Sequence, residues 1–142
     1  MTNVVIAGYA RSPFHLAGKG DLARVRPDDL AAQTIRGLLD KTGVDPAAIE
    51  DIILGCAFPE GEQGLNVARL IGLLADLPLS VGGMTVNRFC GSSMSAIHIA
   101  MGQIAVGAGE AMVQAQEATR KAAEANLAAF QAWTRLWGVG PW

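Results

Sequence analysis

Cys90 is the residue of this sequence best placed for chemistry, because it lies where a predicted strand ends and a predicted helix begins. A helix start presents unpaired backbone N–H groups and the positive end of the helix dipole, which favour a thiolate, the nucleophilic form of cysteine. The backbone N–H of Cys90 could also donate to an oxyanion that forms on an attached acyl group. The alternative is that Cys90 is a small buried hydrophobic residue. Position alone leaves both interpretations open.

The sequence offers no obvious general base for this thiol. His98 follows Cys90 by eight positions, a rise of about 12 Å along a helix, whereas proton transfer needs about 3 Å. We therefore expect His98 to be a core or edge histidine that is bonded to a backbone carbonyl. His15 lies in a predicted loop without an acidic neighbour in sequence, which is typical of an exposed histidine. Cys56 follows a predicted strand and is expected to be a core thiol.

Three strands and three helices are predicted to position Cys90. The first strand is a β-branched run closed by glycine, and the first helix starts with proline and two acidic residues and stops before Gly43. The alternating order favours an α/β layer around a mainly parallel sheet with right-handed crossovers. The predicted strands are Asn3–Gly8, Ile49–Cys56 and Gly82–Arg88, and the predicted helices are Pro27–Lys41, Leu65–Leu74 and Ser92–Val106.

The predicted helix Ser92–Val106 has two faces that are unsuited to water. One face carries a stripe of bulky apolar residues and another carries small residues, so we expect the helix to be sandwiched, with another backbone close to the small side. A membrane span over residues 89–109 is the alternative, since the stretch has no charged residue. Its serines, glycines, His98 and Gln103 argue against lipid exposure, and a buried helix of a soluble protein explains it better.

The composition changes after Glu110. Residues 111–131 are rich in Ala, Glu and Gln without Gly or Pro, which predicts an amphipathic helix from about Glu110 to Trp137. Leu127, Phe130 and Trp133 would share its apolar face. We therefore predict two parts, residues 1–109 and a divergent helical tail at 110–142, with the tail helix ended by Gly138, Gly140 and Pro141.

Composition and charge exclude several classes of function. The 142 residues can form one ordinary domain, and a net charge of −2 with scattered basic residues gives no footprint for nucleic acid or anionic lipid. The two cysteines are 34 positions apart without CxxC spacing or a Cys/His cluster, so we expect no zinc site and no disulfide framework. Reduced thiols and the lack of a basic leader in residues 1–10 predict a cytoplasmic protein.

Four segments, in the same order, resemble the N-terminal part of thiolases, which form or cleave 3-ketoacyl-CoA through a cysteine. The resemblance covers about residues 3–109. It implies that Cys90 accepts the acyl group, that its N–H forms part of an oxyanion hole, and that acyl-CoA and CoA are substrates with no bound cofactor. It also implies that the helix Ser92–Val106 lies between the two halves of the fold and that the chain forms homo-oligomers. The segments are Ala10–Phe14, Glu50–Cys56, Gly61–Arg69 and Val86–Met94.

The resemblance ends near Glu110, where thiolases continue into a strand. The family's second half supplies a histidine that deprotonates the nucleophile, a second cysteine and the CoA-binding loop, and none of these is recognised here; a truncated gene, a frameshift and a fusion all remain open. Two functions follow. The chain is a thiolase-type acyltransferase fragment with negligible turnover alone, or it is a non-catalytic module that self-associates through the helix Ser92–Val106.

Overall fold

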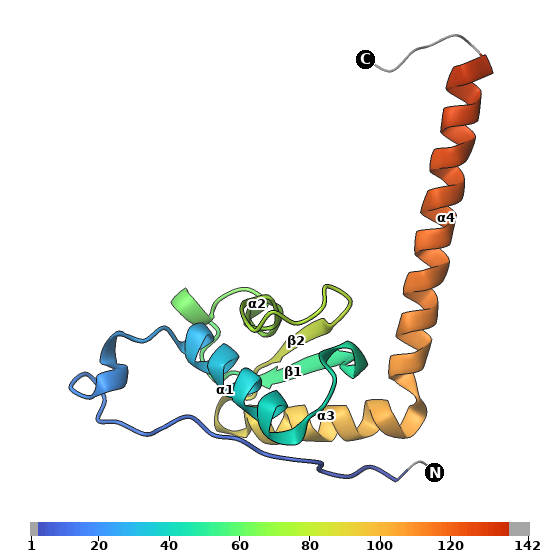
Figure 1. Cartoon of the computed structure of the whole chain (residues 1–142). Helices are drawn as coiled ribbons and strands as arrows, with labels where there is room; N and C mark the ends of the chain where they lie inside the picture. Colours follow the sequence, from blue (N-terminus) through green and yellow to red (C-terminus); the bar gives the residue numbers. More distant parts are fainter. Residues whose placement is uncertain (1–2, 137–142) are drawn as a thin grey trace. The chain divides into compact units, whose positions relative to one another are not determined.

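The computed structural model describes residues 3–136 and divides the chain into two compact units, one ending at Val106 and the other beginning at Gly107 (Figure 1). The first unit is a layered α/β domain. The second consists, in its described part, of one long helix, α4 (Ala108–Leu136). The α/β class and the added C-terminal helix predicted from the sequence are both confirmed.

The sheet of the first unit has two parallel strands, β1 (Asp51–Gly55) and β2 (Gly82–Val86). Their register pairs Asp51 with Gly82 and Gly55 with Val86. Parallel neighbours need a crossover connection, and here it contains the helix α2 (Val67–Leu74). The sequence located both strands correctly but extended each past its observed bounds, β1 by Ile49, Glu50 and Cys56 and β2 by Asn87 and Arg88.

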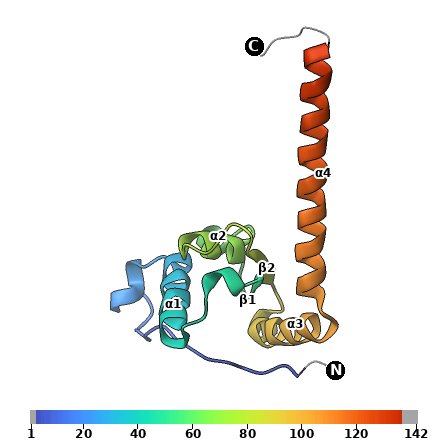
Figure 2. The same cartoon turned by 45° about the vertical axis from the view of Figure 1, so that its right-hand side comes forward.

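Helices cover both faces of this sheet. The helices α1 (Pro27–Thr42) and α2 lie on one side and α3 (Ser92–Val106) lies on the other, as Figures 1 and 2 show from two directions. The core is formed where α1 and α2 meet β1 and the segments next to the strands, and Ile52 and Leu54 of β1 pack against it. Its buried members are Ala32, Cys56, Val67, Ile71, Ala75, Leu77 and Val81.

The boundaries of α1 follow from local sequence signals. Pro27 occupies the first turn, where a missing N–H costs nothing, and Asp28 and Asp29 complement the positive end of the dipole. Gly43 ends the helix in the left-handed conformation, with φ at 67°, and donates its N–H to the carbonyl of Leu39 at 2.8 Å. These features confirm the predicted start and stop.

The prediction of a strand at Asn3–Gly8 is wrong. The segment is extended but unpaired, and Val5 and Ile6 are 77% and 83% exposed. It runs beside the end of α1, where Lys41 Nζ donates to the carbonyl of Tyr9 at 3.1 Å and lies over the Tyr9 ring. A β-branched run has strand propensity, but a strand forms only with a partner. The two strands of the described residues pair with each other and not with this segment.

The helix α4 starts two residues before its predicted start at Glu110. Its predicted end at Trp137, with Gly138, Gly140 and Pro141 beyond it, lies outside the described residues. Arg120 and Glu124 form an ion pair one turn apart at 2.6 Å, a spacing that supports an isolated helix. Leu127 and Phe130, from its predicted apolar face, are both more than half exposed.

Candidate functional site

Cys90 lies in the turn that joins the sheet to the helix on its second face. A short 3-10 helix at Phe89–Gly91 follows β2 and leads directly into α3. Cys90 is exposed and is not in a disulfide. The sequence-predicted junction between a strand and a helix start is therefore confirmed, and the alternative that Cys90 is a buried core residue is wrong for this chain.

Ser92 holds the two sides of this turn together. Its side chain is buried, with the residue 3% exposed, and its Oγ accepts the N–H of Arg88 at 2.9 Å. The same hydroxyl donates to the carbonyl of Phe89 at 2.7 Å. Asn87 adds a third bond, because its Oδ1 accepts the N–H of Phe89 at 2.9 Å. The residues before and after Cys90 are thus tied to one buried hydroxyl.

The backbone before Cys90 is bent into an unusual conformation. Phe89 has φ at 44°, in the left-handed region that side chains other than glycine rarely adopt, and such a conformation persists only when its surroundings fix it. The ring of Phe89 packs edge-on against Phe58, with ring centroids 6.2 Å apart. Phe58 comes from the segment after β1, so the segments that follow the two strands meet beside Cys90.

The start of α3 rests directly on the end of β1. A Cβ atom built on Gly55 would lie 2.3 Å from the backbone N of Ser93 and 2.5 Å from the carbonyl carbon of Ser92. Only glycine allows two backbones to approach so closely. The structure thereby confirms the predicted close approach of another backbone to the small-residue side of this helix.

The opposite side of α3 is uncovered by residues 3–106. Within α3 only Ser92 and Ala96 are buried, so the prediction of a helix packed on both sides is met on one side alone. The stretch Phe89–Val106, with a mean hydropathy of 1.2, is the one described helix long and apolar enough to span a membrane. Four bulky apolar residues that share one face of α3 are 50% to 59% exposed, namely Met94, Ile97, Met101 and Ile104.

Neither histidine is brought to Cys90 by a described contact. His98 lies exposed on α3 rather than in the core, so that prediction is wrong. His15 is exposed as predicted, but it has an acidic partner that its sequence neighbourhood concealed, since Asp21 Oδ2 lies 3.6 Å from its Nδ1. The backbone N–H of Asp21 also donates to this nitrogen at 3.3 Å. Both contacts are local to the loop before α1.

Cys56 is a core thiol, as predicted. It is 5% exposed, and its Sγ lies 3.5 Å from Oε1 of Gln63, to which it donates. Cys56 directly follows β1, whereas Cys90 follows β2. The two thiols therefore differ sharply in access: a reagent in solution reaches Cys90 first.

Two carboxyl groups have shifted pKa values. Hydrogen bonds from the Arg26 guanidinium, at 2.7 and 3.0 Å, lower the pKa of Asp28, whose own burial opposes the shift. Burial raises the pKa of Asp51, which has one carboxylate oxygen, Oδ1, without a partner among the described residues. Neither group belongs to the Cys90 turn, so both concern stability rather than chemistry.

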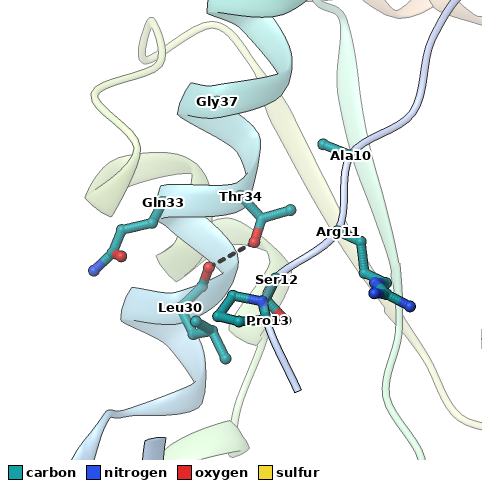
Figure 3. Close-up of a pocket in the computed structure, with 8 residues that line it drawn as sticks. All are labelled: Ala10, Arg11, Ser12, Pro13, Leu30, Gln33, Thr34 and Gly37. Atoms are coloured by element: carbon teal, nitrogen blue, oxygen red, sulfur yellow. Dashed lines mark hydrogen bonds between the residues drawn. The ribbon is translucent and has the colours of Figure 1, made fainter. Parts of the chain in front are cut away.

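A hollow of about 380 Å³ lies between residues 10–13 and α1 (Figure 3). Arg11 points away from α1 in this view and its guanidinium lies over the Phe14 ring at 4.8 Å, which leaves neutral groups around the hollow. None of its lining residues comes from β2 or α3, so it is separate from the Cys90 turn. The lining residues are Ala10, Arg11, Ser12, Pro13, Leu30, Gln33, Thr34 and Gly37.

Metal chemistry receives no support from the described part of the chain, where no group of three or more His, Cys, Asp or Glu side chains could hold an ion. Ser92 is a residue of this turn that the sequence did not single out, since it appeared there only as the first residue of a predicted helix. A serine at a predicted helix start is a known capping signal and could have identified it. Phe58, far from Phe89 in sequence, gave no such signal.

Comparison with known proteins gives the same family for most of the chain. The family model for the N-terminal domain of thiolases matches residues 4–126. A 3-ketoacyl-CoA thiolase from Saccharophagus degradans is 52% identical over 103 residues, which are 72% of this chain and 26% of that protein. A 3-ketoacyl-CoA thiolase from Bacillus subtilis is 49% identical over 104 residues, 73% of this chain and 27% of that protein.

Solved structures agree with these relatives. An acetyl-CoA acetyltransferase from Syntrophomonas wolfei aligns with a TM-score of 0.66 and 35% identity, over 72% of this chain and 26% of that one. A thiolase from Ascaris suum, solved in complex with coenzyme A, aligns with a TM-score of 0.58 and 30% identity, over 63% of this chain and 23% of that one. The chain spans about a quarter of the length of the relatives it matches. It belongs to the thiolase family and corresponds to the N-terminal domain of that family.

Proposed function

We propose that this chain is the acyl-accepting segment of a thiolase-type acyltransferase, with Cys90 as the nucleophile and acyl-CoA as the acyl donor. In this reaction Sγ of Cys90 attacks the thioester carbonyl, the bond between the carbonyl and the CoA sulfur breaks, and CoA leaves as the thiol. The acyl group then remains on Cys90 as a thioester. The observation that carries the proposal is the exposed Cys90 at the start of α3 in a chain of this family.

Turnover by these 142 residues alone is expected to be negligible. Neither His15 nor His98 contacts Cys90 in the described structure, and a missing general base costs about 10²–10⁴ in rate. The relatives are about four times longer than the matched segment, and the resemblance assigns the base and the CoA-binding loop to the remainder. We therefore expect slow, single acylation of Cys90 without catalytic release.

Incubation with acetyl-CoA followed by intact-mass measurement tests this proposal. We expect the unmodified chain to gain one acetyl group slowly. Over the same time Cys90→Ala should gain no acetyl group. Neutral hydroxylamine should remove the acetyl group, because it cleaves thioesters and leaves acetylated lysine intact. Acetylation that is unchanged in Cys90→Ala would overturn the nucleophile assignment, and rapid multiple turnover by this chain would overturn the expected inactivity.

A second candidate function is a non-catalytic module that self-associates through α3. The exposed bulky stripe of α3 favours it, because burying one such side chain stabilises by about 1.5–3 kcal/mol. Sedimentation at micromolar concentration tests it, with Ile97→Glu as the disruptive variant and His98→Glu, an exposed neighbour, as the matched control. A monomeric unmodified chain would rule this function out.

With both thiols free, we further propose a reducing, cytoplasmic location.

A further inference from the structure

Ser92 is the one buried polar side chain of the Cys90 turn. Its hydroxyl acts as both hydrogen-bond acceptor and donor within the turn, since it accepts from the N–H of Arg88 and donates to the carbonyl of Phe89. These two groups lie immediately before Cys90, whereas Ser92 lies after it. The hydroxyl therefore fixes the path of the backbone through residue 90 from a point inside the fold.

The conformation that this hydroxyl holds does not form on its own. Phe89 has φ at 44°, and a non-glycine residue in that region relaxes to negative φ unless neighbouring bonds prevent it. Relaxation would rotate the peptide that joins Phe89 to Cys90, and this peptide contains the N–H of Cys90. The direction of that N–H decides whether it can reach an oxyanion on an acyl group attached to Sγ.

We infer that Ser92 is a positioning residue for acyl transfer to Cys90: its hydroxyl keeps Phe89 in the left-handed conformation and so aims the Cys90 N–H at the developing oxyanion. This inference rests on the proposed function of Cys90. It predicts a specific split between two reactions of the same thiol. Alkylation needs only access to the sulfur, whereas acyl transfer also needs the aimed N–H.

The test compares two small reagents that need no CoA-binding loop. Iodoacetamide alkylates Cys90, and p-nitrophenyl acetate acetylates it with release of p-nitrophenolate, each followed by peptide mass mapping. Removal of a whole oxyanion donor costs about 10²–10³ in rate. Because the N–H remains and loses only its direction, we expect Ser92→Ala to lower acetylation relative to alkylation by about tenfold. Ser93→Ala, an exposed neighbour on the same turn, should leave this ratio unchanged.

Two further measurements separate positioning from general damage to the fold. Ser92→Thr keeps the hydroxyl and should keep the ratio within about threefold of the unmodified chain. Hydrogen exchange of the Arg88 amide should accelerate in Ser92→Ala, because its acceptor is lost, while Cys56 should stay protected from iodoacetamide. Accelerated exchange with an unchanged ratio would overturn the inference, and so would an equal loss in Ser92→Ala and Ser92→Thr.

Failure of the proposed function has a different signature. An unmodified chain whose Cys90 is alkylated but takes no acetyl group from p-nitrophenyl acetate would overturn the acyl-acceptor role itself, and the positioning role with it. A chain that is acetylated at Cys90 with the same ratio in all three serine variants would leave the acyl-acceptor role standing and overturn only the role of Ser92.

Discussion

Replacing Gly55 by alanine would place a methyl group inside the contact between β1 and the start of α3. The added Cβ would lie 2.3 Å from the backbone N of Ser93, whereas ordinary contacts begin at 3.4 Å. The two backbones must therefore separate by about 1.1 Å, and neither can yield by rotating a side chain. Overpacking of this kind costs about 1–3 kcal/mol, and we expect the upper half of that range because backbone must move.

The assay is thermal or denaturant unfolding followed by circular dichroism, with Cys90 acetylation measured on the same samples. For a unit of about this size a loss of 2–3 kcal/mol lowers the unfolding midpoint by roughly 10–20 °C. Gly102→Ala is the matched control on α3, because nothing lies within 4 Å of its added Cβ. It should stabilise the chain by about 0.5–1 kcal/mol. A Gly55→Ala chain as stable as the unmodified one would refute the proposed contact.

Three further substitutions test local features of the fold by unfolding measurements. Asp51→Asn should stabilise the chain by about 0.5 kcal/mol at pH 7, because burial raises the pKa of Asp51 and disfavours its charged form in the folded state. This gain in stability should vanish near pH 3, where the carboxyl group is protonated in both states. A gain that stays constant with pH would contradict this explanation. Asp28→Asn should destabilise the chain at pH 7, because Arg26 lowers the pKa of the Asp28 carboxyl in the folded state and so stabilises the fold when that group is charged. The loss should disappear well below pH 3.8, the ordinary pKa of aspartate, because Asp28 is then protonated and the ion pair is gone. A loss of stability that does not depend on pH would count against the ion pair. Gly43→Ala should cost about 1 kcal/mol, since φ of 67° is left-handed, and a neutral result would argue against that helix end.

Local signals in the sequence were sufficient for most elements of the first unit. Pro27 and Gly43 mark the ends of α1 through backbone chemistry that acts within a few residues, and the apolar runs around Ile53 and Met84 locate both strands. The position of Cys90 between β2 and α3 followed from the same patterns. Such features depend on neighbours in sequence, so they are visible without the fold.

Features that depend on distant partners were beyond the sequence. Asn3–Gly8 has the composition of a strand, yet pairing requires a neighbour that the described residues do not provide. His15 gained Asp21 as a partner through the path of its loop, and Phe89 gained Phe58 because the segments after β1 and β2 lie together. His98 was expected at a core or edge position, yet it lies exposed on α3. For the strand and for Phe89 the missing information was a tertiary contact, and for His15 it was the path of a loop.

The site of acetylation is the most direct test of the account as a whole. After incubation with acetyl-CoA and digestion, peptide mass mapping should find the hydroxylamine-sensitive acetyl group on the peptide that contains Cys90 and not on the one that contains Cys56. An acetyl group found on Cys56, or only on lysine, would contradict the assignment of Cys90 as the acyl acceptor.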